Sequence, residues 1–141
     1  MVTVGIDIGA TKMEAALVCE GKILHSLRED TQKEAITAQA TRLASQLAPG
    51  KPVGIGIAGQ VQEGVVINAP NIGLKNYPLQ KLLEETLHAP VTVINDVQAS
   101  AFGELRYGAA KKSERLFEVS AATTTEVVSS WFVSRMIAAS D

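Results

Sequence analysis

Four residues near the start of the chain, within the stretch "DIGATK", are of types that can bind phosphate: Asp7, Gly9, Thr11 and Lys12. Glycine lets a turn backbone approach an anion closely, while turn amides, a hydroxyl and a lysine ammonium can donate to phosphate oxygens. Asp7 could hold the Mg²⁺ that accompanies phosphates, through water molecules, because Mg²⁺ releases its own waters reluctantly. The same residues are equally compatible with a plain hairpin turn after a strand that carries one polar residue on its solvent face.

Asn95 and Asp96 follow the apolar run "VTVI", at the expected end of a buried strand. Open α/β sheets bind ligands beyond the carboxyl ends of their strands. Asparagine donates and accepts hydrogen bonds and an ionised aspartate only accepts, so the pair could contact neighbouring hydroxyls. Asp96 could also position a hydroxyl for attack on phosphorus, since a loose transition state requires mainly alignment and late proton acceptance. Taken alone, Asp96 is better explained as the cap of the following helix.

Two further segments are weaker candidates. The loop "NAPNIGLKNYP", residues 68–78, is polar and marked by prolines; its Asn71 could donate to a sugar hydroxyl, although a loop without function explains it better. "GIGIAG", residues 54–59, matches the G-x-G-x-x-G expression of dinucleotide-binding folds. A strand and a turn follow it in place of the helix N-terminus that the motif requires, so we do not expect a dinucleotide site.

The elements that carry these residues can be predicted from the pattern of apolar side chains. Apolar side chains at every second position predict a strand over 2–8, and strand candidates at 13–19 and 22–28 complete an antiparallel meander. Thr31 and Glu34 form a T-x-x-E capping box, which predicts a helix that continues at helical spacing to the next Pro-Gly pair.

The rest of the chain should alternate strands and helices. The expected elements are, in order, a strand over 53–58, an extended continuation through "GQVQEGVVINAP" with a turn at Glu63-Gly64, a loop through Tyr77, a helix from Pro78, a strand over 91–95 and a helix from Asp96. The last helix should bury Val97, Ala101 and Leu105 and end before Gly108. The order βββαβαβα predicts a mixed sheet flanked by helices, and hence an α/β domain.

Composition limits the classes of protein to which the chain can belong. Its 141 residues suit one domain, and 46% hydrophobic with 20% charged residues are typical of a folded globular protein. A net charge of −2 gives no basic surface for nucleic acid or an anionic membrane, and no apolar run approaches the ~20 residues of a membrane span. Cys19 is the single cysteine, so no internal disulfide can form and a cytoplasmic location is expected.

Three segments together resemble the N-terminal domain of the ROK family of bacterial sugar kinases and repressors. They are "GIDIGATKMEAALV", "VGIGIAGQVQEGVVINAPNIGLKNYPL" and "VTVINDVQASAFGELRYGAA", and the similarity covers residues 1–117. The family belongs to the actin, hexokinase and Hsp70 superfamily, in which two ribonuclease-H-like domains close on ATP and sugar. The resemblance therefore implies a ribonuclease-H-like fold and an ATP-dependent kinase of the glucokinase type, acting on a hexose or N-acetylhexosamine.

The resemblance also implies a role for each candidate residue. The first phosphate motif of the family, which meets ATP and Mg²⁺, is matched by Asp7, Gly9, Thr11 and Lys12, with Asp7 holding the metal through water. Positions at the sugar are matched by Gly59, Asn71, Asn95 and Asp96. Asp96 in addition matches the general base for the hydroxyl that is phosphorylated.

The last part of the chain departs from the family pattern. Residues 118–141 contain no glycine, and the second phosphate loop, the structural zinc ligands and a sugar-binding glutamate of the family have no match there. We therefore expect no zinc site and interpret the chain as a truncated or frame-shifted product, inactive alone, whose exposed face could promote a homodimer. Two alternatives stay open: a sugar-sensing transcriptional regulator of the same family, and a non-catalytic sugar-binding remnant.

Overall fold

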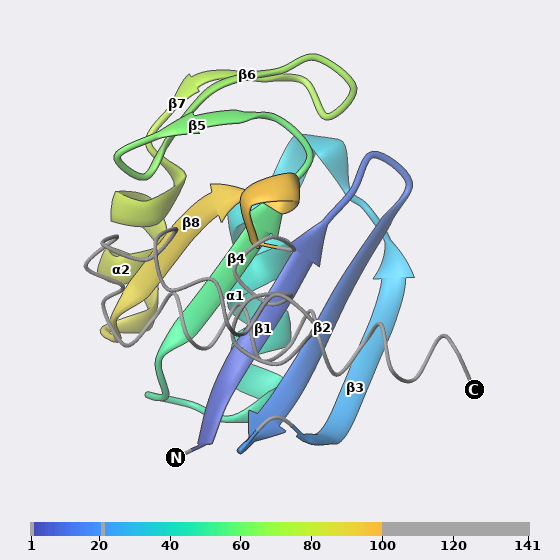
Figure 1. Ribbon diagram of the computed structural model, residues 1–141, viewed down its shortest axis with the longest axis vertical. Helices are drawn as coiled ribbons and strands as arrows, with labels where there is room; N and C mark the ends of the chain where they lie inside the picture. The colour runs from blue at the N-terminus through green and yellow to red at the C-terminus, as the bar shows by residue number, and fades with distance from the viewer. Residues whose placement is uncertain (1, 21, 100–141) are drawn as a thin grey trace, which may run out of the picture.

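The computed structural model describes residues 2–20 and 22–99, which form two β-sheets with helices packed on the larger one (Figure 1). The larger sheet has five strands in the spatial order β3-β2-β1-β4-β8. These strands are β1 (Val2–Ile8), β2 (Lys12–Cys19), β3 (Lys22–Asp30), β4 (Val53–Ile57) and β8 (Val91–Asn95). β1, β4 and β8 run parallel, whereas β2 and β3 are antiparallel to their neighbours. The predicted mixed sheet, with its opening meander, is confirmed.

One face of this sheet packs against α1 (Ile36–Leu47) and α2 (Leu79–Leu87), and the two helices contact each other. Strand alternation sends a set of Val and Ile side chains to this face, where they are almost fully buried: Val4, Ile6, Ile8, Val53, Ile55, Ile57, Val91 and Val93. α1 adds Ile36, Ala40 and Leu43 at the predicted helical spacing. Removal of this apolar surface from water is the main force that fixes the sheet on its helices.

A second, three-stranded sheet stands over the carboxyl ends of β1, β4 and β8 (Figure 1). Its antiparallel strands are β5 (Gln60–Gln62), β6 (Val65–Ala69) and β7 (Leu74–Tyr77). The turn expected at Glu63-Gly64 joins β5 to β6. The loop expected through Tyr77 is wrong for its last four residues, because they pair with β6 and bury Leu74. The ladder with β6 satisfies backbone groups that a loop would have left to water.

The capping box expected at Thr31 and Glu34 is wrong. A 3₁₀ turn, η1 (Lys33–Ala35), precedes α1 and contains Glu34, and Ala35 stands at the N-cap of α1 with no side-chain cap. The Thr31 hydroxyl donates instead to the carbonyl of Gly9, 2.8 Å away. A partner 22 residues distant in the chain therefore takes the hydroxyl that a local cap would have used.

A helix begins after β8 as expected, and its described residues are 96–99. Val97, expected on the buried stripe, is 72% exposed, whereas Ala99 is fully buried against Ala16 and Val18 of β2. Residues two apart point to nearly opposite sides of a helix, so contact of Ala99 with β2 turns Val97 outward. The other features expected further along, Ala101, Leu105, Gly108 and the segment 118–141, lie outside the described residues.

Candidate functional site

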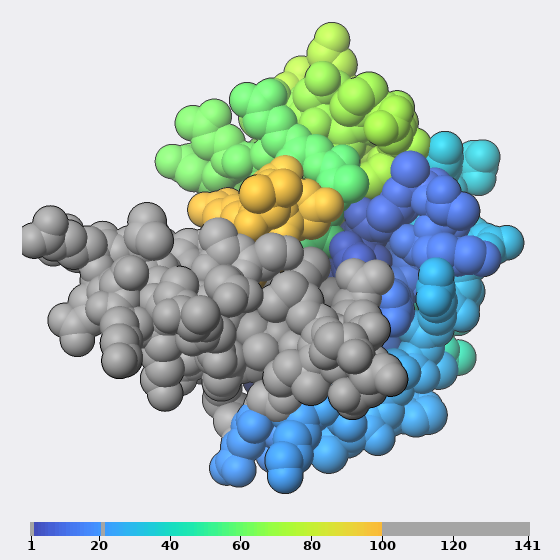
Figure 2. Space-filling model, turned by 45° about the vertical axis from the view of Figure 1, so that its right-hand side comes forward, coloured from blue at the N-terminus to red at the C-terminus, as the bar shows by residue number. Residues whose placement is uncertain are grey.

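Three parallel strands end level at one edge of the large sheet. Ile8, the last residue of β1, pairs with Ile57 of β4, and Ile57 pairs with Asn95 of β8. The segments that leave these strands therefore start side by side: the β1–β2 turn, the link to β5 and the last helix. Figure 2 shows the end of β8 and the helical turn, in orange, at the surface below the small sheet. This edge is where α/β folds usually bind ligands.

The β1–β2 turn is closed by a hydrogen bond within it and is also bonded by Thr31, a residue outside the turn. The amide of Gly9 donates to the carbonyl of Lys12 over 3.0 Å, and a Cβ atom at Gly9 would lie 3.1 Å from that oxygen. The Gly9 carbonyl accepts from the Thr31 hydroxyl at 2.8 Å, and the Thr11 carbonyl accepts from the Thr31 amide at 2.9 Å. The side chains of Thr11 and Lys12 are exposed. A glycine, a hydroxyl and a cation thus meet at the surface, as phosphate binding requires.

Lys12 forms an ion pair with Asp30, the last residue of β3. The lysine lowers the pKa of the Asp30 carboxyl, through the hydrogen bond first and the charge second. The side chains of Lys12 and Asp30 are 46% and 82% exposed, and pairs so exposed to water contribute little to stability. The lysine ammonium can therefore exchange Asp30 for a phosphate at small cost.

Asp7 lies one residue before the end of β1 and is half-buried. It alternates with the buried Ile6 and Ile8, so its side chain is on the sheet face opposite α1. Glu14 of β2 and Gly56 of β4 are its neighbours across the sheet. A carboxylate at this edge, next to a phosphate-type turn, is the donor that a hydrated Mg²⁺ on bound phosphates uses, so the residues present fit that ion.

The side-chain amide of Asn95 connects the segment after β4 with the start of the last helix. Its Nδ2 donates to the carbonyl of Gly59, beyond β4. Its Oδ1 accepts from the amides of Val97 and Gln98, at 2.9 and 3.3 Å, which is the N-cap arrangement. Asn95 is therefore the principal cap of the last helix, a role that the sequence reading had offered to Asp96.

Asp96 is the first residue of that helix. Its Oδ1 accepts from the amide of the next residue, Val97, at 2.8 Å. Because Asn95 already bonds the amides that a cap must satisfy, helix capping gives no strong reason for a carboxylate at position 96. The half-buried carboxylate lies at the common end of the three parallel strands.

Gly59 fits closely under the small sheet. A Cβ atom at this position would lie 2.7 Å from the Cβ of Ala69 and 2.9 Å from the carbonyl of Asn68, both on β6. Asn71 lies two residues after Ala69, the end of β6, and is exposed in the turn between β6 and β7. The structure thus brings Gly59, Asn95 and Asp96 into one corner; it places Asn71 in the turn that extends from the strand above Gly59.

Comparison with known proteins identifies the family. The sequence profile of the ROK family matches residues 3–125. The chain belongs to the ROK family. It is 38% identical over 120 residues to the glucokinase of Streptomyces coelicolor and 37% identical over 113 residues to the N-acetylmannosamine kinase of Shigella boydii. These matches cover 77% and 74% of this chain but 37% and 39% of the relatives, so the chain spans less than two fifths of their length.

A solved structure agrees with this ROK assignment. The glucokinase of Streptomyces griseus, in complex with glucose and AMPPNP, superposes with a TM-score of 0.70 at 38% identity, covering 79% of this chain and 38% of that one. The predicted family and the actin-like α/β fold of its N-terminal domain are confirmed. The relatives are sugar kinases, and one of them binds an ATP analogue.

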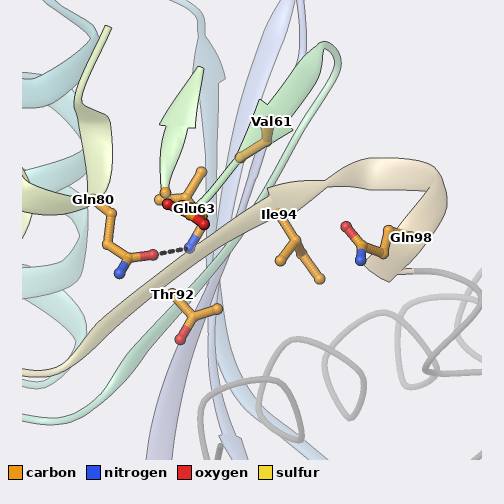
Figure 3. Close-up of a pocket in the computed structure, with 8 residues that line it drawn as sticks. Val61, Glu63, Gln80, Thr92, Ile94 and Gln98 are labelled. Atoms are coloured by element: carbon orange, nitrogen blue, oxygen red, sulfur yellow. Dashed lines mark hydrogen bonds between the residues drawn. The ribbon is translucent and has the colours of Figure 1, made fainter. Parts of the chain in front are cut away.

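The ROK chain also has a cavity of about 420 Å³ beside β8 that sequence reading did not indicate (Figure 3). None of the predicted site residues lines it; the lining includes Val61, Glu63, Gln80, Thr92, Ile94 and Gln98. The side-chain oxygen of Gln80, on α2, accepts from the Val93 amide at 3.0 Å, and the backbone amide of Gln80 donates to the Gly64 carbonyl at 3.2 Å. Gln80 thus joins α2, the β5–β6 turn and β8.

Sequence reasoning also missed Gln39, which is 1% exposed on α1. A signal for it existed, because a polar residue stands in the apolar helical stripe, next to Ala40 and between Ile36 and Leu43.

In the described part of the chain, no cluster of three or more His, Cys, Asp and Glu side chains could hold a metal ion. Over the same residues, no helix is long and apolar enough to cross a membrane.

Proposed function

We propose that this chain supplies the phosphate-binding and sugar-binding half of an ATP-dependent hexose kinase. The observation that carries the proposal is the level ending of β1, β4 and β8, through the pairs Ile8–Ile57 and Ile57–Asn95. It brings a phosphate-type turn and a corner with a carboxylate to one edge of the sheet. Phosphoryl transfer depends mainly on such placement of the donor, the acceptor and the surrounding charges.

The turn of residues 9–12 takes the phosphates of ATP in this proposal. Gly9 lets the backbone approach them closely, the Thr11 hydroxyl donates a hydrogen bond, and Lys12 leaves Asp30 to contribute its charge. Asp7 holds Mg²⁺ through water. When bound there, Mg²⁺ would neutralise charge on the phosphates of ATP as the γ-phosphoryl group passes to the sugar and ADP leaves.

The sugar binds in the corner of Gly59, Asn95 and Asp96. Asp96 orients the acceptor hydroxyl and accepts its proton as the bond to phosphorus forms. Asn95 keeps one N–H of its amide available beyond the bond to Gly59, so it can donate to a sugar hydroxyl while it caps the helix. Asn71 contributes from the turn between β6 and β7.

Known kinases suggest the range of acceptors. The matched relatives are a glucokinase and an N-acetylmannosamine kinase at nearly equal identity, 38% and 37%. We therefore propose a hexose or an N-acetylhexosamine as acceptor. The matches span less than two fifths of those relatives, so we expect efficient transfer only when the remaining family sequence closes over the site and excludes water.

A chimera tests the proposal. Residues 3–117 of this chain replace the matching residues of the Streptomyces coelicolor glucokinase, and ATP-dependent phosphorylation of glucose and of N-acetylmannosamine is measured for the chimera and for the 141-residue chain alone. We expect transfer by the chimera and little or none by the chain alone. A folded chimera that binds sugar but phosphorylates none, for either sugar, would contradict a catalytic role and favour a sugar-binding domain.

A further inference from the structure

Gln39 carries a polar amide on the apolar face of α1, and only 1% of its surface is exposed. Burial of an amide costs free energy unless its hydrogen-bonding groups are satisfied. The side-chain oxygen of Gln39 accepts from the Gln32 amide at 2.7 Å. Its nitrogen donates to the Asp30 carbonyl and to the Glu29 carboxylate, each at 2.8 Å. Every one of these bonds goes to residues 29–32, which we call the strap.

The strap lies against the phosphate-type turn. Thr31, in its middle, donates through its amide to the Thr11 carbonyl at 2.9 Å and through its hydroxyl to the Gly9 carbonyl at 2.8 Å. Asp30 of the strap pairs with Lys12. The turn is therefore held by the strap. The strap in turn is held by the β2–β3 ladder at residues 29 and 30, by the ion pair of Glu29 with Arg42, and by one buried side chain of α1, Gln39.

Besides holding two carbonyl groups, these bonds determine the direction of two backbone amides. In a planar trans peptide the C=O of one residue and the N–H of the next point in opposite directions. With the Gly9 and Thr11 carbonyls directed at Thr31, the amides of Ala10 and Lys12 are directed away from the strap. Backbone amides aimed to the same side of a turn are the groups that bind phosphate oxygens.

We propose that Gln39 and Thr31 are positioning residues for the phosphate turn. They act through the strap and touch no substrate: Gln39 sets the place of the strap, and Thr31 sets the direction of the turn amides. The assignment of phosphate as the ligand rests on the proposed function, whereas the mechanical link from Gln39 to the turn does not.

Amide hydrogen exchange of the 141-residue chain tests the link. The variants are Gln39→Met, which keeps size and removes the hydrogen bonds, and Thr31→Val, which removes the hydroxyl. Exchange in the peptides that cover residues 9–12 and 29–32 should accelerate by about tenfold in both, the effect of losing a hydrogen bond or two. Thr31→Ser, which keeps the hydroxyl, should return exchange to the wild-type rate.

Thr37→Val is the matched control. Thr37 is also on α1, and its hydroxyl shares a hydrogen bond of 2.7 Å with the hydroxyl of Tyr77, away from the strap. This variant should leave exchange at residues 9–12 unchanged. Equal exchange there in Thr31→Val and Thr37→Val overturns the proposal. If Gln39→Met does not fold, the comparison of Thr31→Val with Thr31→Ser decides, because Thr31 lies only half-buried.

Steady-state kinetics of the chimera then separates positioning from general damage. Thr31→Val should raise the KM for ATP by about tenfold and leave the KM for sugar unchanged, since the corner of Asn95 shares no bond with the strap. A parallel rise of both KM values overturns a specific role in the turn. A chimera without any transfer counts against the proposed function, and the exchange rates still decide whether Gln39 and Thr31 position the turn.

Discussion

The two halves of the candidate site are held in different ways. The turn of residues 9–12 is braced by Thr31, a residue with no predicted role at any substrate. The corner of Gly59 and Asp96 is braced by Asn95, which is itself a predicted sugar ligand. At the phosphate half, a substitution of Thr31 can therefore remove support of the turn without removing a group that is predicted to bind substrate. At the sugar half the two roles share one side chain, and Asp96 is the residue whose removal should change chemistry alone.

The largest effect is expected for Asp96→Asn in the chimera. The amide cannot accept a proton from the acceptor hydroxyl, so kcat should fall by about 10²–10⁴-fold, the usual contribution of a general base. The KM for sugar should change little. Initial rates with saturating ATP, together with sugar titration by calorimetry, measure both.

The thermal midpoint of Asp96→Asn provides the control. Asn95 bonds the amides of Val97 and Gln98, so the cap survives this substitution and the midpoint should stay close to wild type. Turnover that survived in Asp96→Asn would make this corner a structural helix start and remove the difference between the two halves.

Gly59→Ala should produce the largest loss of stability in the sugar half. The added methyl would lie 2.7 Å from the Cβ of Ala69 and 2.9 Å from the Asn68 carbonyl, so the small sheet must shift. Such overpacking costs about 1–3 kcal/mol in the free energy of unfolding, measurable by urea denaturation. Affinity for sugar should fall as well.

Gly50→Ala is the comparison for that experiment. Gly50 has a φ of +76° with nothing within 4 Å of an added Cβ, so its substitution costs only backbone strain of about 1 kcal/mol. It lies between α1 and β4, at the end of the sheet opposite the site. If both alanine variants lost stability equally and kept sugar affinity, close contact at Gly59 would have no functional meaning.

Asn95→Ala and Asn95→Asp together divide the double role of Asn95. The alanine removes both the cap and the bond to Gly59, and loss of an N-cap alone costs about 1 kcal/mol of unfolding free energy. The aspartate keeps an acceptor for the Val97 amide but cannot donate to Gly59. We expect Asn95→Asp to regain part of the stability lost in Asn95→Ala while sugar affinity stays low. Sugar affinity equal to wild type in Asn95→Asp would show that the donor is not needed.

Much of the fold could be predicted because its signals are local. Side-chain alternation in β1 and helical spacing in α1 reveal their buried faces, and both were confirmed. The strand Leu74–Tyr77 was missed although its partner, β6, is the strand just before it in the chain. The other two errors share one cause. Thr31 and Val97 each depend on a partner that is remote in the chain: Gly9, and the contact of Ala99 with β2. No local pattern reports such a partner.

In the candidate site, too, the residue types could be predicted from the sequence, whereas the contacts that support them could not. The residue types of Asp7 to Lys12 and of Asn95-Asp96 were visible in the sequence, and strand register then explains why they share an edge. The support around them was not visible. Which of two adjacent polar residues caps a helix depends on backbone direction, and here Asn95 takes the cap. Gln39 was detectable as a polar interruption of an apolar stripe, but its partners were not.

The smallest expected effect is a pH dependence confined to the phosphate half. A hydrogen bond from Arg42, with a second from Gln39, lowers the pKa of Glu29, and Lys12 lowers the pKa of Asp30. A carboxyl whose pKa is lower in the folded state stabilises the fold at pH values above its unfolded pKa. That stability disappears as pH falls through the folded pKa. Starting from the ordinary values of 4.5 and 3.8, the loss should therefore begin near pH 4.5 and continue below it.

Glu29→Gln isolates this effect. The side chains of Glu29 and Arg42 are 31% and 43% exposed, so solvent screens the pair and its contribution should stay below about 1 kcal/mol. Thermal midpoints measured from pH 6 to pH 3 should fall less steeply for Glu29→Gln than for wild type, and Asn95→Asp should show no such flattening. Identical slopes for Glu29→Gln and wild type would mean that the Glu29–Arg42 pair does not hold the turn. Its order would then depend on Gln39, Thr31 and the exposed Lys12–Asp30 pair, which would make the phosphate half as dependent on single side chains as the sugar half.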